Sequence, residues 1–191
     1  MNRKYFLSLL GLSSLAHLNN EVMGETTIQP EVFYFKDDGR IPNNKLPLLL
    51  YRKALSKGLS AQKLQRQFAT NNWTNSWDNG VYSFHHFHST SHEVLGIYAG
   101  SALLHLGGEK GEKVNVAAGD VIVIPAGVGH KNLGSSSDFG VVGAYPDGRD
   151  WDLLKGEPGE RPRADKNIAA LPVPDMDPLL GKAEGLIKLW S

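Results

Sequence analysis

The sequence predicts an all-β protein of short antiparallel strands, and three observations support this fold class. From Gly80 onward the chain consists of short segments rich in Val, Ile and aromatic residues. Gly, Ser and Asp separate these segments at intervals of about ten residues, a spacing typical of sandwiches and barrels. The 21 Gly and 10 Pro residues of the 191-residue chain supply the tight turns that such a fold needs.

Composition limits the classes of partner and site. The hydrophobic share of 41% and the charged share of 21% are those of an ordinary globular chain with a sizeable core. The 20 basic residues balance the 20 acidic ones and form no block, so we expect no nucleic-acid partner. Cysteine is absent. Any metal site must therefore use histidine, carboxylates or water.

Residues 1–24 differ from the rest of the chain. Arg3 and Lys4 precede an apolar run to about Leu18, which is too short to span a bilayer but has the form of a secretory signal. The stretch NRKYFLS also resembles a degenerate twin-arginine signal. We therefore predict a signal peptide, export to the periplasm and no transmembrane segment in the mature chain. An N-terminal extension of a cytoplasmic protein is the alternative.

The segment before Gly80 is expected to hold a strand, a buried run and a short helix. EVFYFKDDGR reads as a strand ending in a turn, and LPLLLYRKAL contains the buried apolar run. LSAQKLQRQFATNN is a helix signal in which Ser60 can cap the first turn. Ala61, Leu64 and Phe68 share one face of that helix.

Beyond this helix we expect a series of strands and then an arm. The predicted strand segments are GVYSFHHFH, HEVLGIYAG, SALLHLGG, EKVNVAAGD, DVIVIPAG, GHKNLG and DFGVVGAYP. The tail from Pro146 is polar and Pro-rich, and it is expected to wrap the barrel, with covering an open sheet edge or forming a lid as the alternatives. GLIKLW near the end of the chain predicts a last strand or helical turn.

Strand parity sorts the histidines of SFHHFHSTSHE. Side chains two residues apart on a strand share a face, so His86 and His88 point the same way, as do Tyr82 and Phe84. His85 points to the opposite face. His92 is expected to point away from the barrel and to act as a turn residue.

Two further residues can complete a metal site with the histidine pair. A hairpin after His88 would return Glu93 towards the pair, and His130 follows the sharp turn of IPAGVG. Three imidazoles and one carboxylate suit a divalent transition metal: Fe, Mn, Ni, Zn, Co or Cu. In octahedral geometry this ligand set leaves two positions for water, oxygen or substrate.

The spacing of these residues resembles the cupin superfamily. The first cupin motif, G-x5-H-x-H-x4-E-x6-G, matches from Gly80 to Gly100 at every fixed position. The second, G-x5-P-x-G-x2-H-x3-N, begins at Gly119 and departs only at its last position, where Gly134 replaces Asn. Phrases such as HSTSHEVLG and GDVIVIPAGVGHKNLG are similar, more narrowly, to small YjlB-like bacterial cupins of unassigned substrate. The motif core spans residues 80–134.

The resemblance implies a cupin double-stranded β-helix, a jelly-roll barrel, formed as a single domain by residues 25–191. It implies four metal ligands, which are His86, His88, Glu93 and His130. Combined with parity, it implies a mostly apolar pocket lined by Tyr82, Phe84, Leu95, Ile97 and Asn132. Such a pocket suits a small molecule of limited charge. Cupin barrels commonly pair through exposed strands, so a homodimer is expected.

Two classes of function follow from this site. The first is a mononuclear divalent-metal enzyme acting on a small metabolite, with dioxygenase-type or isomerase/lyase-type chemistry. The second is a non-catalytic cupin that binds a small ligand or metal without turnover. A third interpretation, which needs no site, is a cupin used chiefly as a dimerisation module. His85 and His105 are expected in structural or surface roles, and the tryptophans in packing. Asp150 and Asp152 reach the barrel mouth only if the tail folds back.

Overall fold

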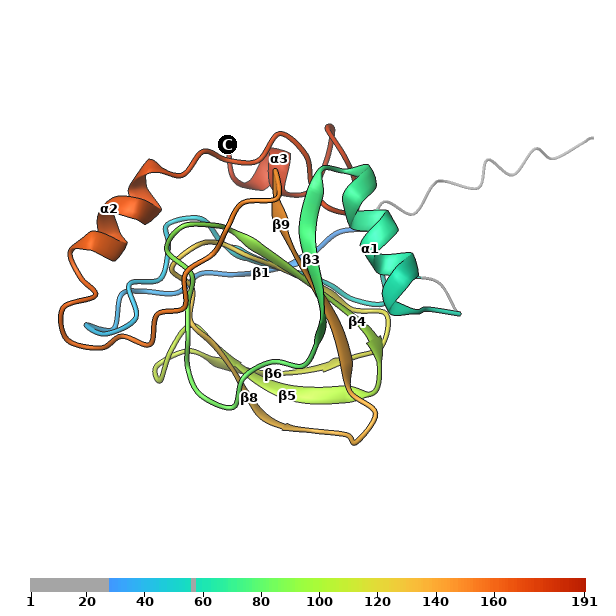
Figure 1. The fold of residues 1–191 in the computed structure, drawn as a ribbon, viewed down its shortest axis with the longest axis horizontal. Helices are drawn as coiled ribbons and strands as arrows, with labels where there is room; N and C mark the ends of the chain where they lie inside the picture. Colours follow the sequence, from blue (N-terminus) through green and yellow to red (C-terminus); the bar gives the residue numbers. More distant parts are fainter. Residues whose placement is uncertain (1–27, 56–57) are drawn as a thin grey trace, which may run out of the picture.

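Two antiparallel sheets face each other and form a barrel in the computed structural model, which describes residues 28–55 and 58–191 (Figure 1). The predicted leader, residues 1–24, lies outside the described residues. The larger sheet has six strands in the order β1-β2-β7-β4-β9-β3, and the smaller has three in the order β6-β5-β8. Except for β1–β2 and β5–β6, strands that neighbour in a sheet are not consecutive in the chain, as in a jelly roll. The predicted all-β fold class is confirmed.

The strands of the larger sheet pair antiparallel throughout. They are β1 (Glu31–Phe33), β2 (Leu48–Tyr51), β3 (Trp73–Asn79), β4 (Glu93–Ala99), β7 (Val121–Ile124) and β9 (Gly140–Pro146). The strands of the smaller sheet are β5 (Ser101–Leu106), β6 (Glu112–Ala117) and β8 (His130–Ser135). The core between the two sheets consists of aliphatic side chains such as Leu50, Leu104 and Ile122.

The two sheets differ in how they are covered. Every residue of β7 and of β9 is buried, whereas β6 alternates between exposed and buried positions near its end. Continuous burial means that both faces of the larger sheet are covered, and alternation means that one face of the smaller sheet meets solvent. Burial of apolar area on both faces therefore concentrates hydrophobic stabilisation in the larger sheet.

Helix α1 (Ala61–Thr70) covers part of the outer face of the larger sheet. The Ser60 hydroxyl accepts a hydrogen bond from the Lys63 N–H at 3.4 Å, and Ala61, Leu64 and Phe68 are the buried residues. Phe68 packs in a second core on that outer face. The predicted helix, its cap and its buried face are confirmed.

The C-terminal arm contains α2 (Arg163–Ala170) and the helical turn α3 (Leu186–Leu189). Its last part packs on the same outer face of the larger sheet as α1, whereas α2 lies on the other side of the barrel in Figure 1. Buried Asp177 accepts hydrogen bonds from the Tyr51 hydroxyl and from the Leu186 N–H. Trp190 is buried and donates to the Pro47 carbonyl at 2.8 Å. The arm is thus fastened by apolar contacts and by buried polar groups.

Two segments differ from the sequence prediction. Strand β3 was not expected, because WTNSWDN is rich in Asn and Asp, which have low strand propensity. A register shift between Thr74 and Trp77 and a positive φ of 53° at Asn75 mark an irregular strand. The segment 80–88 contains no full strand; only His86 and Phe87 form isolated bridges.

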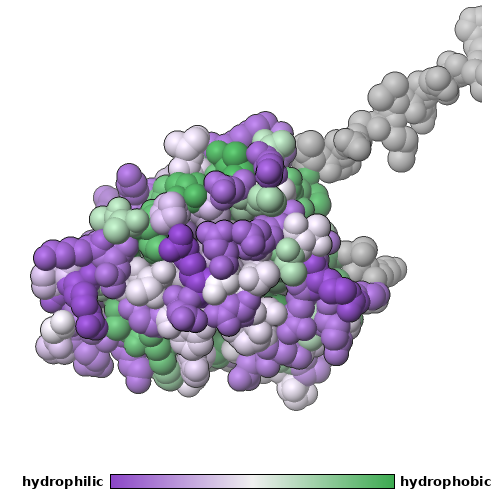
Figure 2. Space-filling view, turned by 45° about the horizontal axis from the view of Figure 1, so that its top comes forward, coloured by the Kyte–Doolittle hydropathy of each residue, from purple (hydrophilic) through white to green (hydrophobic). Residues whose placement is uncertain are grey.

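The described surface is mostly hydrophilic on the face shown in Figure 2, with apolar residues in smaller patches. Among the exposed large apolar residues are Tyr82 and Trp151, which are 48% and 37% exposed. Both lie at the cavity described below. Within residues 28–55 and 58–191, no helix has the length and apolar character needed to cross a membrane.

Candidate metal centre

The segment that carries His86 and His88 is held between strand β8 and the C-terminal arm. The backbone N–H of His86 donates to the His130 carbonyl at 3.2 Å, and the His130 N–H returns a bond at 2.9 Å. On the other side, Phe87 and Leu154 exchange two backbone hydrogen bonds of 2.9 and 3.0 Å. The segment is extended enough to keep the predicted parity: Phe87 lies in a small core with Leu154, while His86 and His88 line the cavity.

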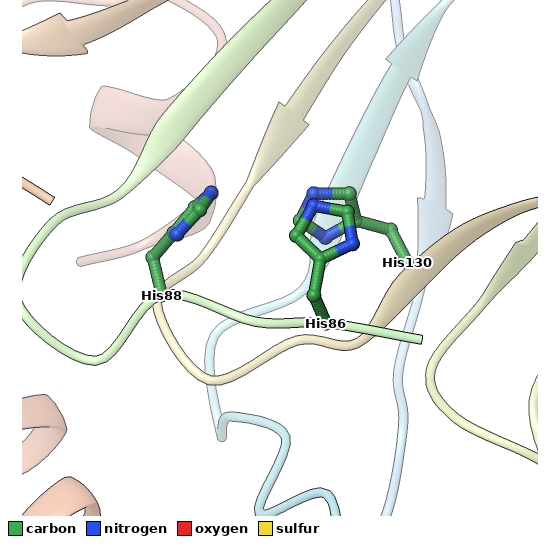
Figure 3. Close-up of side chains that lie close together, drawn as sticks. All are labelled: His86, His88 and His130. Atoms are coloured by element: carbon green, nitrogen blue, oxygen red, sulfur yellow. The ribbon is translucent and has the colours of Figure 1, made fainter. Parts of the chain in front are cut away.

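All four predicted ligands lie together. His86, His88 and His130 are buried, and each has a ring nitrogen within 4.8 Å of one in each of the other two. Figure 3 shows the three rings turned toward a shared space. Glu93, the first residue of β4, places Oε2 3.5 Å from His88 Nε2 and 3.2 Å from His130 Nε2. The cluster joins side chains from both cupin motifs.

Backbone carbonyls orient each of the three imidazoles. The Nδ1 atoms of His86 and His130 lie 3.3 and 3.2 Å from the carbonyl oxygens of Phe84 and Val128. His88 Nδ1 bonds the carbonyl oxygen of Asp152. A carbonyl can only accept, so each Nδ1 must carry a proton and donate. The Nε2 atoms of the neutral rings therefore hold the lone pairs, the arrangement that metal-ligating histidines need.

The two oxygens of Glu93 have different surroundings. Oε1 accepts a hydrogen bond of 3.0 Å from the Tyr145 hydroxyl, which in turn accepts one of 2.8 Å from Trp77 Nε1. Oε2 is buried and has no hydrogen-bond partner among the described residues. A buried oxygen without a partner costs free energy unless a cation or donor meets it. Facing His88 and His130, this oxygen fits the donor set of a divalent metal.

The neighbouring histidines stabilise the ionised form of the Glu93 carboxyl. Burial by itself would raise the pKa of the Glu93 carboxyl, but the charge of His88 and the contact with His130 outweigh it and lower that pKa. Burial would lower the pKa of His88, but the nearby Glu93 charge outweighs it and raises the pKa. Burial lowers the pKa of His86 to about 2, and the neighbouring histidines add to this effect. Protonation of His88 Nε2 and binding of a metal ion beside Glu93 Oε2 would thus exclude each other.

The cluster opens into a cavity of about 470 Å³. Its walls include Trp77, Tyr82, Tyr145 and Trp151, together with polar residues of β3. Among residues 28–55 and 58–191, no lysine or arginine lines it. Trp151 stacks on Tyr145 with ring centroids 5.8 Å apart, and lies 5.1 Å from the His88 ring. The cavity therefore offers aromatic faces next to the candidate metal position and no fixed positive charge.

The predicted pocket residues divide into two groups. Tyr82 and Leu95 line the cavity. The other three do not, which corrects the prediction. Ile97 lies deeper on the Glu93 face of β4, in the core between the sheets. Phe84 borders a neighbouring hollow, where Lys155 Nζ lies 4.5 Å from its ring centroid. The Asn132 side chain bonds Ser135 and Gly134 near the end of β8.

The C-terminal arm folds back and contributes to the site, which was the condition given for Asp152 to reach the barrel mouth. Asp152 bonds His88 through its carbonyl, and its carboxylate accepts from the N–H and the hydroxyl of Ser89, both at 2.6 Å. Trp151, expected only to pack, lines the cavity. A polar segment such as GRDWDLL carries no periodic signal, so its contacts with the distant residues 88–90 could not be read from sequence.

Tyr145 was also missed, although a signal for it existed. In β9 the parity of GVVGAYP places Val141, Gly143 and Tyr145 on one face, and the register pairs Leu95 with Gly143. Tyr145 therefore shares the face of Glu93, but this follows only once β9 is known to pair with β4. Gly143 is needed here, because an added Cβ would lie 2.1 Å from Trp77 Cε2, in the ring that bonds Tyr145.

His92 departs from its predicted role as a turn residue. It points away from the four-residue cluster as expected, but it is buried, and its Nδ1 accepts a 3.0 Å hydrogen bond from the Ala126 N–H. Its ring lies 4.9 Å from that of Trp190. The arm covers this side of the hairpin, and that long-range contact explains the burial.

A jelly-roll barrel whose cavity collects three histidines and a glutamate from these two motifs is a cupin. No family model matches the chain. The chain is 44% identical over 163 residues to the uncharacterized protein YjlB of Bacillus subtilis, covering 85% of this chain and 97% of that protein. The chain therefore belongs to the YjlB family of cupins, as the resemblance indicates.

Solved structures match more loosely. Acireductone dioxygenase from Bacillus anthracis, with a cadmium ion in its active center, is 15% identical over 56% of this chain and 78% of its own, with a TM-score of 0.34. Procruciferin, an 11S globulin from Brassica napus, is 14% identical over 57% of this chain, with a TM-score of 0.33. This chain spans only 22% of the procruciferin length. The fold assignment rests on the strand order and motifs of the chain itself.

Proposed function

We propose that this protein is a mononuclear metalloenzyme in which His86, His88, Glu93 and His130 hold one divalent transition metal. The observation that supports this most directly is the orientation of the donors. Three imidazoles are fixed through Nδ1 to backbone carbonyls, and the unpartnered Oε2 of Glu93 faces two of their Nε2 atoms. Without a cation, this arrangement would leave a buried carboxylate oxygen unsatisfied.

A metal held there would supply Lewis-acid chemistry or oxygen activation at positions open to the cavity. The residues of the chain have separate tasks. Tyr145 keeps the Glu93 carboxylate in place through Oε1, and the Asp152 carbonyl keeps the His88 ring in place. Trp151 and Tyr82 flank the site and offer aromatic faces to a bound molecule. Dioxygenase-type and isomerase/lyase-type reactions both fit this division.

The cavity favours a small substrate of low negative charge. Because no lysine or arginine of the described residues lines the cavity, a carboxylate or phosphate would have only the metal to balance its charge there. The aromatic walls suit a planar or partly apolar molecule, which can stack on Trp151 or Tyr82. Cavities of this volume hold metabolite-sized ligands. We therefore expect an uncharged or singly charged metabolite.

Binding without turnover is the second candidate, and one observation favours it. Outside the four-residue cluster, the described lining of the cavity contains one carboxylate, Asp78, and it accepts a 2.8 Å hydrogen bond from the Tyr98 hydroxyl. Within the described parts of the chain, no separate imidazole or free carboxylate at the cavity is placed to act as a general base. Any reaction would depend on the metal, and without one the cavity could only bind.

The test begins with metal analysis of the untagged protein purified from its own host. We expect close to one transition metal per chain, and oxygen uptake or isomer formation with some member of a panel of small neutral metabolites. His88→Ala should lose both the metal and the activity, whereas Tyr98→Phe should keep both. Full metal content without turnover across the panel would favour the second candidate. Wild-type protein that is folded but takes up no divalent metal would overturn both metal-dependent forms of the proposal.

Three further expectations stay predictions. They are export directed by residues 1–24, assembly as a homodimer, and a single domain spanning residues 25–191. Size-exclusion chromatography with light scattering measures the oligomer. The N-terminal sequence of the protein isolated from its host measures whether the leader is removed.

A further inference from the structure

A second cluster of metal-ligand side chains lies on the reverse face of the same segment. His85, one residue before His86, points away from the cavity and meets His105 of β5, with His85 Nε2 3.2 Å from His105 Nδ1. Glu109, in the turn after β5, places Oε1 3.4 Å from His85 Nε2. We call these three residues the outer cluster, and His86, His88, Glu93 and His130 the inner cluster.

We propose that the outer cluster is a second divalent-metal site, formed by His85, His105 and Glu109 and independent of the inner cluster. The separations support this geometry. Two donors that each lie about 2.1 Å from one ion, at angles between about 90 and 110°, are about 3.0 to 3.4 Å apart. The distances of 3.2 and 3.4 Å fall in this range. Two imidazoles and a carboxylate suit zinc, nickel, cobalt or copper.

The surroundings of the outer cluster point in the same direction. The His85 and His105 rings are largely buried, whereas the Glu109 side chain is 73% exposed, so an ion could enter from the surface. The cluster adjoins a surface hollow of about 300 Å³ that His85 and Glu109 help to line. His85 Nδ1, the ring nitrogen on the far side from His105 and Glu109, is buried and has no hydrogen-bond partner within the described parts of the chain. No carbonyl therefore orients this ring as carbonyls orient the inner rings, which makes the outer cluster the weaker of the two sites.

The positive charge of Lys131 is expected to lower the affinity of the outer cluster for a divalent ion. The β5–β8 register pairs His105 with Lys131, and Lys131 Nζ lies 3.8 Å from Glu109 Oε1. A divalent ion at the outer cluster would displace this ammonium from Glu109 and be repelled by it. We therefore expect weaker binding at the outer cluster than at the inner one. An ion there would fasten residue 85 to β5, directly beside the segment that carries His86.

The experiment uses untagged full-length protein, because a histidine tag would itself bind these metals. The variant His88→Ala/His130→Ala removes two inner donors and leaves the outer cluster intact. Equilibrium dialysis with Zn²⁺ should show one retained ion per chain in this variant. Adding His105→Ala should abolish that binding. Co²⁺ titration should give visible absorption bands that disappear with the same substitution.

Glu109→Gln keeps the test valid if a histidine variant misfolds, because this side chain is 73% exposed. In otherwise wild-type protein it should weaken the second Zn²⁺ equivalent at least tenfold and leave the first unchanged. Glu112→Gln, an exposed glutamate on β6, is the matched control and should change neither. Lys131→Met should tighten the second equivalent by roughly fivefold, because one nearby positive charge is removed. A wild-type protein that binds one equivalent only, or a second equivalent insensitive to Glu109→Gln, would overturn the proposal.

Discussion

The two faces of the segment 84–88 place histidines in opposite environments. On the inner face, His86 and His88 are buried and each ring is tied through Nδ1 to a backbone carbonyl. On the outer face, His85 bonds another imidazole, and its carboxylate neighbour Glu109 is 73% exposed and shared with Lys131. Both faces present imidazole and carboxylate donors. What differs is how firmly the surroundings hold each donor.

This difference indicates how the fold assigns functions to neighbouring residues. A donor whose tautomer and ring orientation are already fixed loses little freedom when it binds a metal. A donor on a flexible exposed side chain loses more. We therefore expect the inner cluster to bind metal tightly and to depend on its supporting residues, and the outer cluster to bind weakly.

The largest expected effect is loss of an inner ligand. His88→Ala and, separately, Glu93→Gln should weaken metal binding more than about 100-fold, because even supporting residues of a metal site commonly contribute 10- to 100-fold. Competition with a chelator of known affinity measures this change. Glu109→Gln on the outer face is the control and should leave the tight site unchanged. If Glu93→Gln bound metal as tightly as wild type, the inner cluster would not be the tight site.

Removing the support of Glu93 should have the next largest effect. Tyr145→Phe deletes the hydroxyl that donates to Oε1 at 3.0 Å and keeps the ring. We expect metal affinity to fall by about tenfold, the lower end of the range for outer-shell partners. Tyr82→Phe lines the same cavity without a hydrogen bond to Glu93, and should have little effect. Equal affinities for the two variants would show that Glu93 needs no such support.

The lowered pKa of His92, the buried histidine next to Glu93 in the sequence, implies a pH dependence of stability. Burial lowers the pKa of His92 to about 4, from 6.5. Between these pH values the unfolded chain binds a proton that the folded chain does not. The free energy of unfolding should therefore fall as the pH drops from about 6.5 to 4, by at most about 1.4 kcal/mol per pH unit from this residue.

Denaturant titrations of wild type and His92→Asn at several pH values measure this contribution. The asparagine oxygen can still accept from the Ala126 N–H, so the variant should fold. The stability difference between the two proteins should shrink or reverse as the pH falls. Only the wild-type chain takes up a proton at residue 92 when it unfolds, so only its stability falls for this reason. Parallel curves between pH 4 and 6.5 would show that His92 does not titrate as its burial requires.

The smallest expected effect concerns the outer face. Glu109→Gln should change the free energy of unfolding of the metal-free protein by less than about 0.5 kcal/mol, because exposed ion pairs contribute little. Thermal unfolding in the presence of a chelator measures this. A large loss of stability would mean that Glu109 makes contacts that stabilise the fold. The outer donors would then be held by their surroundings, as the inner donors are.

Much of the fold was predictable because its signals are local. The cap at Ser60, the face of α1 and most of the strand segments depend on residues a few positions apart. The inner cluster was predictable for a different reason: the resemblance supplied the link between Glu93 and His130, 37 positions apart by their residue numbers. Parity alone grouped only His86 with His88.

The remaining parts of the site depend on contacts between distant segments with weak local signals. Tyr145 reaches Glu93 through the register of β4 and β9, and Asp152 reaches His88 through the arm. Asn132 shares the parity of His130, but its side chain bonds Ser135 instead of facing the cavity. Parity gives the face of a strand; it does not give the depth of a residue along the barrel or its local hydrogen bonds.

The hydrogen bond from His88 to the Asp152 carbonyl couples two processes, which are docking of the C-terminal arm and metal binding at the inner cluster. The same residue fastens the arm through Ser89, so docking of the arm and orientation of His88 occur together. By reciprocity, whatever free energy the docked arm adds to metal binding, bound metal adds to docking of the arm. Limited proteolysis should therefore cut within residues 147–160 faster after chelation than before it. The rate at which a protease cuts the arm would then report whether the inner cluster holds a metal.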